Sequence, residues 1–290
     1  MLIARLIAET DECETCLATL ADALADRGVT LVSTDLTGDL LELACEGDRA
    51  AVLAAIDTAF APADMLVSNG PIEVPQLFVS DMDSTMIGQE CIDELADYAG
   101  IKPQIAAITE RAMQGELDFE TALRERVALL ANLDEGAIHT CLAERITATP
   151  GARTLVATLA ALGTRTVLVT GGFHHFADPV AEMLGFHRVV GNRLAVEGGK
   201  LTGGLIGPIT DSAVKAAVLR EELGLLGEGA HSLATGDGAN DIPMIEAATY
   251  GFAYRAKARA RAAANGRIDA GDLTAVLTLL GVQREEWRDN

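Results

Sequence analysis

The spacing of hydrophobic residues along the first 70 positions predicts a small unit of strands and helices. Residues 11–26 place apolar side chains at helical spacing, and the Ala-rich stretch 48–60 also indicates a helix. Short apolar runs between turn-forming residues predict strands at 2–8, 29–36, 40–45 and 64–67. The order strand, helix, strand, strand, helix, strand is typical of a ferredoxin-like sheet with its helices on one face.

A different pattern begins after residues 68–75, a stretch dense in Gly and Pro that predicts a linker. Strands are predicted at 76–80, 164–170 and 231–235, and residues 87–149 are expected to form several helices. Strands that alternate with helices indicate a parallel, doubly wound sheet. Ligands of such sheets collect beyond the C-terminal ends of the strands.

Shorter signals complete the second part of the chain. Glycine pairs between short apolar runs predict a hairpin at 188–208, and residues 211–223 have helical spacing. Two edge strands are expected at 251–254 and 268–270, followed by a closing helix at 272–280.

Composition narrows the class of protein. Hydrophobic residues make up 49% of the 290 residues, enough for a large core, and aromatic residues only 4%. Forty-three acidic residues against 22 basic ones give a net charge of −21, which argues against nucleic acid and anionic membranes as partners. A phosphorylated ligand would also be repelled, so any phosphate site must carry its own local positive charge.

The sequence also predicts a cytoplasmic location. The five cysteines form no disulfide-like framework, and an odd number suits a reducing compartment. The N-terminus is apolar but short and lacks a basic leader, so no signal peptide is expected. A run of about 18 apolar residues, the length that a transmembrane helix needs, does not occur.

Two carboxylates crowd the end of one predicted strand. The apolar run 77–80 ends in Asp81, and Asp83 follows two residues later. Close carboxylates repel each other, which is costly unless a cation holds them together or catalysis uses them. One can act as nucleophile and the other as proton donor, while a hard divalent ion neutralises both.

Three further signals follow in the chain. Thr-Gly-Gly at 170–172 offers a hydroxyl and backbone N–H groups to an anion at the expected start of a helix. Lys215 stands on a predicted helix, and Gly-Asp-Gly-Ala-Asn-Asp at 236–241 can ligate a metal. Each has an ordinary structural explanation by itself, but the ends of parallel strands would bring most of them to the edge where Asp81 lies.

Taken in order, Asp-x-Asp, Thr-Gly-Gly, Lys and Gly-Asp-Gly-x-Asn-Asp resemble the four motifs of the haloacid dehalogenase (HAD) superfamily. Within it, the chain is similar to the phosphoserine phosphatases from about residue 76 to the C-terminus. The similar segments are 81–94, 113–115, 119–127, 171–173, 192–194 and 198–203. The resemblance implies a HAD-like doubly wound parallel sheet over residues 71–290, with a helical cap at about 87–149. Residues 1–70 resemble the ACT-like, ferredoxin-like α+β domains that precede it in some relatives.

The resemblance also implies roles for the acidic residues. Asp81 would be the nucleophile and a Mg²⁺ ligand. Asp83 would be the general acid for the serine oxygen and then the base for water, and its backbone carbonyl would bind the same ion. Asp237 would be the remaining protein ligand of the Mg²⁺.

The remaining motif residues would hold the phosphate. The resemblance places Thr170, the Gly171 amide and Lys215 on the phosphate, with Asn240 nearby and Asp241 orienting Lys215. The family usually has Ser where this chain has Thr170. The hydroxyl is retained, so phosphate binding is expected to be retained as well.

Two charged residues would select the substrate. O-phosphoserine carries an ammonium and a carboxylate besides its phosphate; Glu90 would pair with the ammonium and Arg126 would grip the carboxylate. Both lie in or beside the helical insertion. Met113 and Phe119 would supply an apolar wall that excludes water.

The implied activity is that of a phosphoric monoester hydrolase: Mg²⁺-dependent hydrolysis of O-phospho-L-serine to L-serine through a covalent aspartyl-phosphate, the last step of serine biosynthesis. Two alternatives stay open. A phosphotransferase could pass the phosphate to another hydroxyl, such as that of homoserine, and a receiver-type signalling module also uses a strand-end Asp, Mg²⁺ and Lys. Residues 1–70 could bind a serine effector or mediate a homodimer.

Three other patterns have simpler explanations. Cys13-x-x-Cys16 lacks the second pair that a zinc site needs, and its spacing puts both thiols on one helix face. His174 and His175 lack the Arg-His-Gly signature of phosphohistidine enzymes and are expected on a helix. The basic run 255–261 is interpreted as a solvated helix face that can raise the potential near the site.

Overall fold

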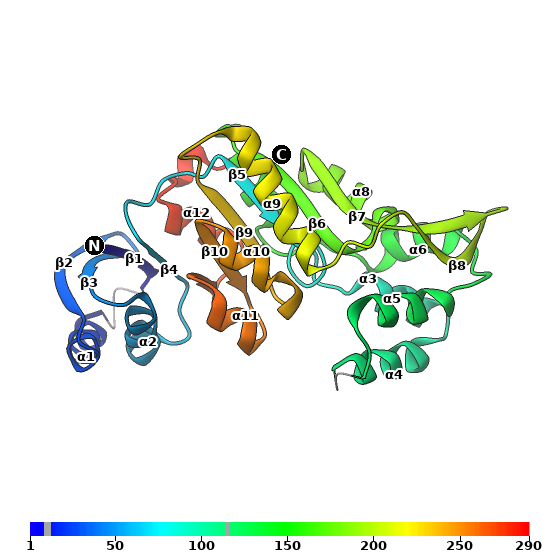
Figure 1. The fold of residues 1–290 in the computed structure, drawn as a ribbon. Helices are drawn as coiled ribbons and strands as arrows, with labels where there is room; N and C mark the ends of the chain where they lie inside the picture. Colours follow the sequence, from blue (N-terminus) through cyan, green and yellow to red (C-terminus); the bar gives the residue numbers. More distant parts are fainter. Residues whose placement is uncertain (9–12, 114–115, 290) are drawn as a thin grey trace.

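One mixed sheet runs through the computed structural model, which describes residues 1–8, 13–113 and 116–289 (Figure 1). Its eleven strands are, in chain order, β1 (Leu2–Ile7), β2 (Thr30–Thr37), β3 (Leu40–Glu46), β4 (Met65–Ser68), β5 (Leu77–Ser80), β6 (Arg165–Phe173), β7 (Arg188–Glu197), β8 (Lys200–Ile206), β9 (Ser232–Gly236), β10 (Tyr250–Tyr254) and β11 (Gly266–Ile268). Across the sheet they lie in the order β2-β3-β1-β4-β11-β10-β9-β5-β6-β7-β8.

Helices cover the sheet and form an insertion beside it. They are α1 (Cys13–Asp26), α2 (Arg49–Phe60), α3 (Cys91–Tyr98), α4 (Lys102–Met113), α5 (Phe119–Ala128), α6 (Gly136–Arg145), α7 (Ala152–Ala161), α8 (His174–Leu184), α9 (Ser212–Leu226), α10 (Ile242–Ala247), α11 (Ala258–Ala263) and α12 (Ala275–Leu280). No helix among the described residues has both the length and the apolar character needed to cross a membrane.

Residues 1–8 and 13–68, here called the N-terminal unit, form the end of the sheet coloured blue in Figure 1. The predicted order of two helices and four strands is confirmed, and β1 pairs antiparallel with both β3 and β4. The Asp48 carboxylate caps α2 by accepting from the Ala51 amide at 3.1 Å. Alternate buried residues of β1 pack with both helices in a core of their own, as a ferredoxin-like arrangement requires.

The second part of the chain builds a parallel sheet with helices on both faces. Strand β5 lies between β9 and β6 and is parallel to both. All four of its residues are buried, because Leu77 and Val79 face the core under α9 and α10 while Phe78 faces the core under α7, α8 and α12. A strand covered on both faces appears in the sequence as a continuous apolar run, and this is why the pattern at 77–80 predicted it.

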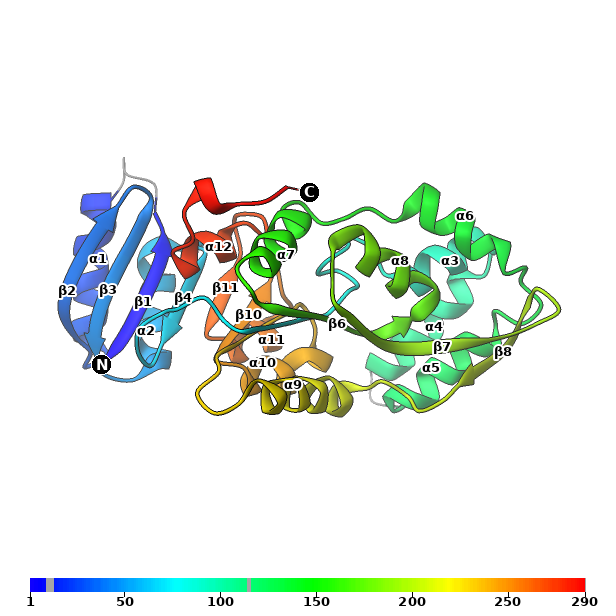
Figure 2. The same ribbon diagram turned by 90° about the horizontal axis from the view of Figure 1, so that it is seen from above.

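Helices α3 to α6 form the predicted helical cap, which lies beyond the ends of the parallel strands (Figures 1 and 2). The hairpin β7–β8 reaches out to it (Figure 2). Backbone hydrogen bonds join the two: Asn132 N–H donates to Leu201 O at 2.8 Å, and Glu135 N–H donates to Gly199 O at 2.9 Å. The cap is therefore held from two directions, by its own connections to β5 and α7 and by this hairpin.

Two sequence predictions need correction. Strands β10 and β11 were expected at an edge, but both are interior strands of the sheet. The reason is that β4 of the N-terminal unit pairs antiparallel with β11, through Leu66 opposite Gly266 and Met65 opposite Arg267. Helix α7 was not predicted, although its buried residues have helical spacing.

Ion pairs reinforce the contact between the N-terminal unit and α11. Asp57 of α2 lies 2.7 Å from Arg261 and 2.6 Å from Arg267. Burial disfavours the Asp57 carboxylate, but the two guanidinium groups outweigh it and hold the pKa of Asp57 below its usual value. Folding therefore favours the charged form of Asp57, and this contribution to stability is present at neutral pH and lost as acid protonates the carboxylate.

We expect Asp57→Ala to lower the free energy of unfolding by about 1–2 kcal/mol at pH 7, because it leaves the buried guanidinium of Arg267 and the partly buried one of Arg261 without their shared partner. The difference from the parent should shrink in acid. Urea unfolding at pH 7 and pH 3.5 measures both effects, with Asp22→Ala, an exposed residue of α1, as control. Equal effects of the two substitutions at pH 7 would contradict the role of the Asp57 pairs.

Candidate active site

The end of β5 places Asp81 at the centre of the site. Asp81 follows the strand directly, and its N–H donates to Thr235 O on the neighbouring β9 at 3.0 Å. Its side chain is buried, and Oδ1 accepts from the Met82 amide at 2.7 Å. Among the described residues, Oδ2 of Asp81 accepts no hydrogen bond. One oxygen is thus fixed and the other is left for chemistry.

Lys215 of α9 is buried between two carboxylates. Its Nζ lies 2.7 Å from Oδ1 of Asp81 and 2.7 Å from Oδ1 of Asp241, and the residue is 1% exposed. Burial by itself would favour neutral lysine, but the two negative charges outweigh it and hold the pKa of Lys215 above its usual value. The site therefore contains a permanent positive charge.

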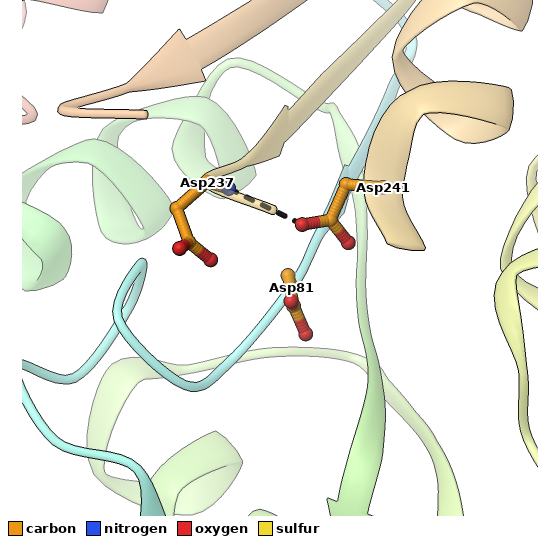
Figure 3. Close-up of side chains that lie close together, drawn as sticks. All are labelled: Asp81, Asp237 and Asp241. Atoms are coloured by element: carbon orange, nitrogen blue, oxygen red, sulfur yellow. Dashed lines mark hydrogen bonds between the residues drawn. The ribbon is translucent and has the colours of Figure 1, made fainter. Parts of the chain in front are cut away.

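Three carboxylates of the site lie close together (Figure 3), and two of them contact Lys215. Asp81, Asp237 and Asp241 each offer an oxygen within 4.8 Å of the others, and all three residues are buried. Asp241 is turned back on its own loop, since Oδ2 accepts from the amides of Asp237 at 3.2 Å and Gly238 at 3.0 Å. Burial and the charge of Asp241 raise the pKa of Asp81 well above its usual value, against the opposing effect of Lys215. Clustered hard oxygen ligands of this kind suit a divalent cation.

The side chain of Asp83 points to a different partner. Its Oδ1 accepts from the Cys91 amide at the start of α3, at 3.2 Å. Its Oδ2 packs against Gly172, where a Cβ would stand only 3.0 Å away, so a side chain at position 172 would push it aside. Burial and the nearby charge of Glu90 raise the pKa of Asp83 to about 7. A carboxyl with this pKa can both release and accept a proton near neutral pH.

The Thr-Gly-Gly motif is part of strand β6, which ends three residues later than the predicted end at residue 170, and the predicted helix follows it. Strand β6 continues through Gly171 and Gly172 to Phe173, and α8 begins at His174. The Oγ1 of Thr170 accepts from the Gly172 N–H at 2.8 Å. Its hydroxyl hydrogen is therefore free to be donated to a ligand.

A cavity of about 610 Å³ joins these groups to the cap. The predicted residues that line it are Asp81, Asp83, Glu90, Arg126, Thr170, Gly171, Asp237 and Asn240. Lys215 does not line the cavity, but its Nζ contacts Oδ1 of Asp81, which does. Phe119 and Leu123 of α5 contribute apolar wall; the side chain of Met113 lies outside the described residues. The structure thus gathers residues that are far apart in the sequence around one space.

The two charged residues on the cap side face this cavity. Glu90 stands just before α3 and accepts from the Ser84 hydroxyl at 2.8 Å. Arg126 of α5 is half-buried, and its Nε donates to Ala122 O at 3.2 Å. Burial lowers the pKa of the Arg126 guanidinium, while Asp93 and Glu90 favour its charge from a distance. No carboxylate of the described residues forms an ion pair with Arg126, so its charge is available to a ligand.

Sequence reasoning missed Lys257 and Arg259 as lining residues. Lys257 Nζ lies 3.3 Å from Oδ2 of Asp237. The signal was the basic run 255–261, which is interpreted from the sequence as a solvated helix face that can raise the potential near the site. Arg261 of that run pairs with Asp57 and Asp269 instead. The run could not be assigned because nothing in the sequence shows which of its side chains turn toward Asp237.

The other patterns stay outside the cavity. His174 and His175 begin α8, as predicted, and neither lines the cavity; His174 lies 2.7 Å from Asp178 of the same helix. Cys16 is a free cysteine, and the side chain of Cys13 lies outside the described residues.

Known proteins resemble more than half of this chain. The family model of the haloacid dehalogenase-like hydrolases matches residues 78–246. A phosphoserine phosphatase of Albidiferax ferrireducens is 42% identical over 231 residues, which cover 77% of this chain and 98% of that protein. A phosphoserine phosphatase of Streptomyces coelicolor is 44% identical over 212 residues, 73% of this chain but only 52% of that longer protein.

Solved structures resemble the chain over different lengths. A HAD family hydrolase of Salmonella enterica serovar Typhi has a TM-score of 0.82 at 26% identity, covering 97% of this chain and 99% of that one. A phospho-aspartyl intermediate analogue of phosphoserine phosphatase has a TM-score of 0.64 at 35% identity, covering 71% of this chain and 99% of that one.

We expect Lys215→Met to lower the free energy of unfolding by about 3–5 kcal/mol without added metal, because Asp81 and Asp241 would remain buried without their cation. Asp81→Asn should change it by less than about 1 kcal/mol or raise it, because the repulsion between two carboxylates is relieved. Urea unfolding in EDTA at pH 7 measures both. A larger loss in Asp81→Asn than in Lys215→Met would contradict this account of the cluster.

Proposed function

The chain belongs to the haloacid dehalogenase-like hydrolase family, and from this premise we propose that it is a phosphoserine phosphatase, which hydrolyses O-phospho-L-serine to L-serine and phosphate. The observation that supports phosphoserine as the substrate is the pair of charged side chains on the cap side of the cavity. Arg126 is a half-buried cation without an ion pair among the described residues, and Glu90 is a carboxylate lining the same cavity. They complement the carboxylate and the ammonium of phosphoserine, respectively.

The phosphate would lie at the opposite end of the cavity. The Thr170 hydroxyl, the Gly171 amide and Lys215 supply its donors, with Asn240 nearby. These groups explain how a protein with a net charge of −21 can bind a dianion, because the positive charge is local. Lys257 and Arg259 add positive charge on the cavity wall.

Asp81 would attack first. Its Oδ2 forms a bond to phosphorus while the bond from phosphorus to the serine oxygen breaks, and the electron pair of that bond goes to the oxygen. The protonated carboxyl of Asp83 gives its proton to the departing oxygen, for which a pKa of about 7 is suited. The products of this step are L-serine and an aspartyl-phosphate on Asp81.

Water would complete the reaction. The Asp83 carboxylate accepts a proton from a water molecule, whose oxygen bonds to the phosphorus of the aspartyl-phosphate. The bond between phosphorus and Oδ2 of Asp81 breaks, which releases inorganic phosphate and restores both carboxyl groups. Phe119 and Leu123 limit the access of other water to the intermediate.

The buried carboxylates fit a Mg²⁺ ion. Asp81 and Asp237 would hold it with the backbone carbonyl of Asp83, and Asp241 offers a further oxygen within 4.8 Å of the first two. The fit rests on the donor set, which is three buried carboxylates whose oxygens lie within 4.8 Å of one another. When bound, Mg²⁺ supplies charge neutralisation that lets a carboxylate approach a phosphate dianion.

Several wider assignments belong to the same proposal. Residues 71–290 would form the phosphatase domain with its cap at about 87–149, and residues 1–70 an ACT-like domain that binds a serine effector or mediates a homodimer. The reaction would be the last step of serine biosynthesis in the cytoplasm. The free cysteines Cys16, Cys45, Cys91 and Cys141 are compatible with that compartment.

Phosphate release from phosphoserine, phosphothreonine, glucose 6-phosphate and p-nitrophenyl phosphate, with Mg²⁺ and with EDTA, tests this function. We expect phosphoserine to be the preferred substrate and EDTA to abolish turnover. Asp81→Asn should lose at least 10³-fold in kcat, roughly the scale of removing a nucleophile, whereas the exposed Asp22→Asn should lose nothing. Equal rates for Asp81→Asn and the parent, or phosphohomoserine as the product when homoserine is added, would refute the proposal.

Arg126→Ala tests the substrate assignment. It should lower kcat/KM for phosphoserine about 10²-fold, because the substrate carboxylate would lose its charged partner. The value for p-nitrophenyl phosphate, which has no such carboxylate, should change less than about threefold. Arg124→Ala is the matched control, since Arg124 lies on the same helix but pairs with Glu120 at the surface. Equal losses on both substrates would remove Arg126 from recognition.

A further inference from the structure

We propose that Asn192 of β7 is a positioning residue for phosphate binding, acting through the Gly171–Gly172 peptide and the Thr170 hydroxyl. The inference deepens the proposed function, on which it rests. Asn192 does not line the cavity and touches no reacting atom. Its effect would come from the backbone that it holds in place.

The strand register shows why this backbone needs a support. Strands β6 and β7 pair in parallel up to Val169 opposite Val190, and the next pair is Phe173 opposite Asn192. Four residue steps on β6 thus match two on β7. Residues 170–172, which carry the phosphate-binding groups, bulge out of the ladder and lack regular strand partners on that side.

Asn192 supplies the missing contact. It is 1% exposed, and its Nδ2 donates to the Gly171 carbonyl at 2.7 Å. Its Oδ1 accepts from the Thr210 N–H at 2.9 Å. Thr210 is two residues before α9, the helix that carries Lys215. One buried amide therefore ties the bulge to the segment that leads into the lysine helix.

The peptide plane transmits the effect to Thr170. The carbonyl of Gly171 and the N–H of Gly172 belong to one planar trans peptide and point in opposite directions. Since Asn192 fixes the carbonyl, the N–H points the other way, to Oγ1 of Thr170 at 2.8 Å. The hydroxyl oxygen is then occupied as an acceptor, and its hydrogen is left for the phosphate.

The residue before Asn192 keeps the two strands close enough. A Cβ at Gly191 would stand 3.2 Å from Cγ2 of Thr170 and 3.3 Å from the Gly172 carbonyl oxygen. Such contacts would push β7 away from the bulge. The close approach of β7 to residues 170–172 therefore requires a glycine at position 191 and a short amide side chain at position 192.

Asn192→Ala, with Asn265→Ala as matched control, tests the inference. Asn265 is also buried, and its amide also bridges two backbone segments: Oδ1 accepts from Gly251 N–H at 2.7 Å, and Nδ2 donates to Val67 O at 3.1 Å. It does not line the cavity. Both substitutions should lower the melting temperature. Only Asn192→Ala should weaken inhibition by inorganic phosphate, by about tenfold, the effect expected for a lost hydrogen bond.

A double-mutant cycle separates positioning from general damage. If Asn192 acts through the Thr170 hydroxyl, Asn192→Ala should raise the inhibition constant of phosphate much less in a Thr170→Val background than in the parent. Additive effects, or equal effects of Asn192→Ala and Asn265→Ala, would overturn the proposal. Should Asn192→Ala fail to fold, the isosteric Asn192→Asp keeps an acceptor for Thr210 and loses the donor to Gly171, and the same tenfold loss is expected.

The assay keeps this inference distinct from the proposed function. Inhibition is measured with p-nitrophenyl phosphate as substrate, so a preference for some phosphate ester other than phosphoserine would refute the function but leave the Asn192 result readable. If no ester is hydrolysed, calorimetric binding of inorganic phosphate to the parent and to both Asn variants replaces inhibition. Unchanged phosphate affinity in Asn192→Ala would then refute the inference alone.

Discussion

The buried ammonium of Lys215, 2.7 Å from both Asp81 and Asp241, is the contact on which the rest of the site depends. Without it, the charges of two buried carboxylates would repel each other in a poorly hydrated space. With it, Asp81 has one oxygen fixed and one available, and Asp241 is free to brace the loop that carries Asp237. The same ammonium is a buried positive charge in contact with a residue that lines the cavity, in a protein whose net charge is −21.

The parallel sheet explains how these groups meet. Strands β5, β6 and β9 are neighbours and run in the same direction, so Asp81, Thr170 and Asp237 emerge at one edge. The cap then closes the far side with Arg126 and Glu90, and the β7–β8 hairpin holds the cap through backbone hydrogen bonds. In the proposed function, phosphate chemistry and substrate choice would thus be carried by different parts of the chain, the first by the central sheet and the second by the inserted helices.

Hydrogen bonds and ion pairs outside the cavity hold these elements in place. Asn192 connects the bulge in β6 to the approach to α9, and Asp57 connects α2 of the N-terminal unit to Arg261 on α11. Lys257, whose ammonium contacts Asp237, stands just before α11. The N-terminal unit is therefore joined to the side of the site by a continuous sheet and by ion pairs, rather than by a linker alone.

The sequence by itself indicated most of the elements, though not α7, and the candidate site residues. The apolar run before Asp81, the order of strands and helices, and the spacing of the four motifs are local properties, so they could be read along the chain. Only the tertiary structure decided that Asp241 joins the carboxylate cluster, that Lys257 faces Asp237, that Asn192 supports Gly171, and that β11 is an interior strand. These facts depend on distances between residues far apart in the chain, and side-chain direction across a sheet leaves no periodic signal in the sequence.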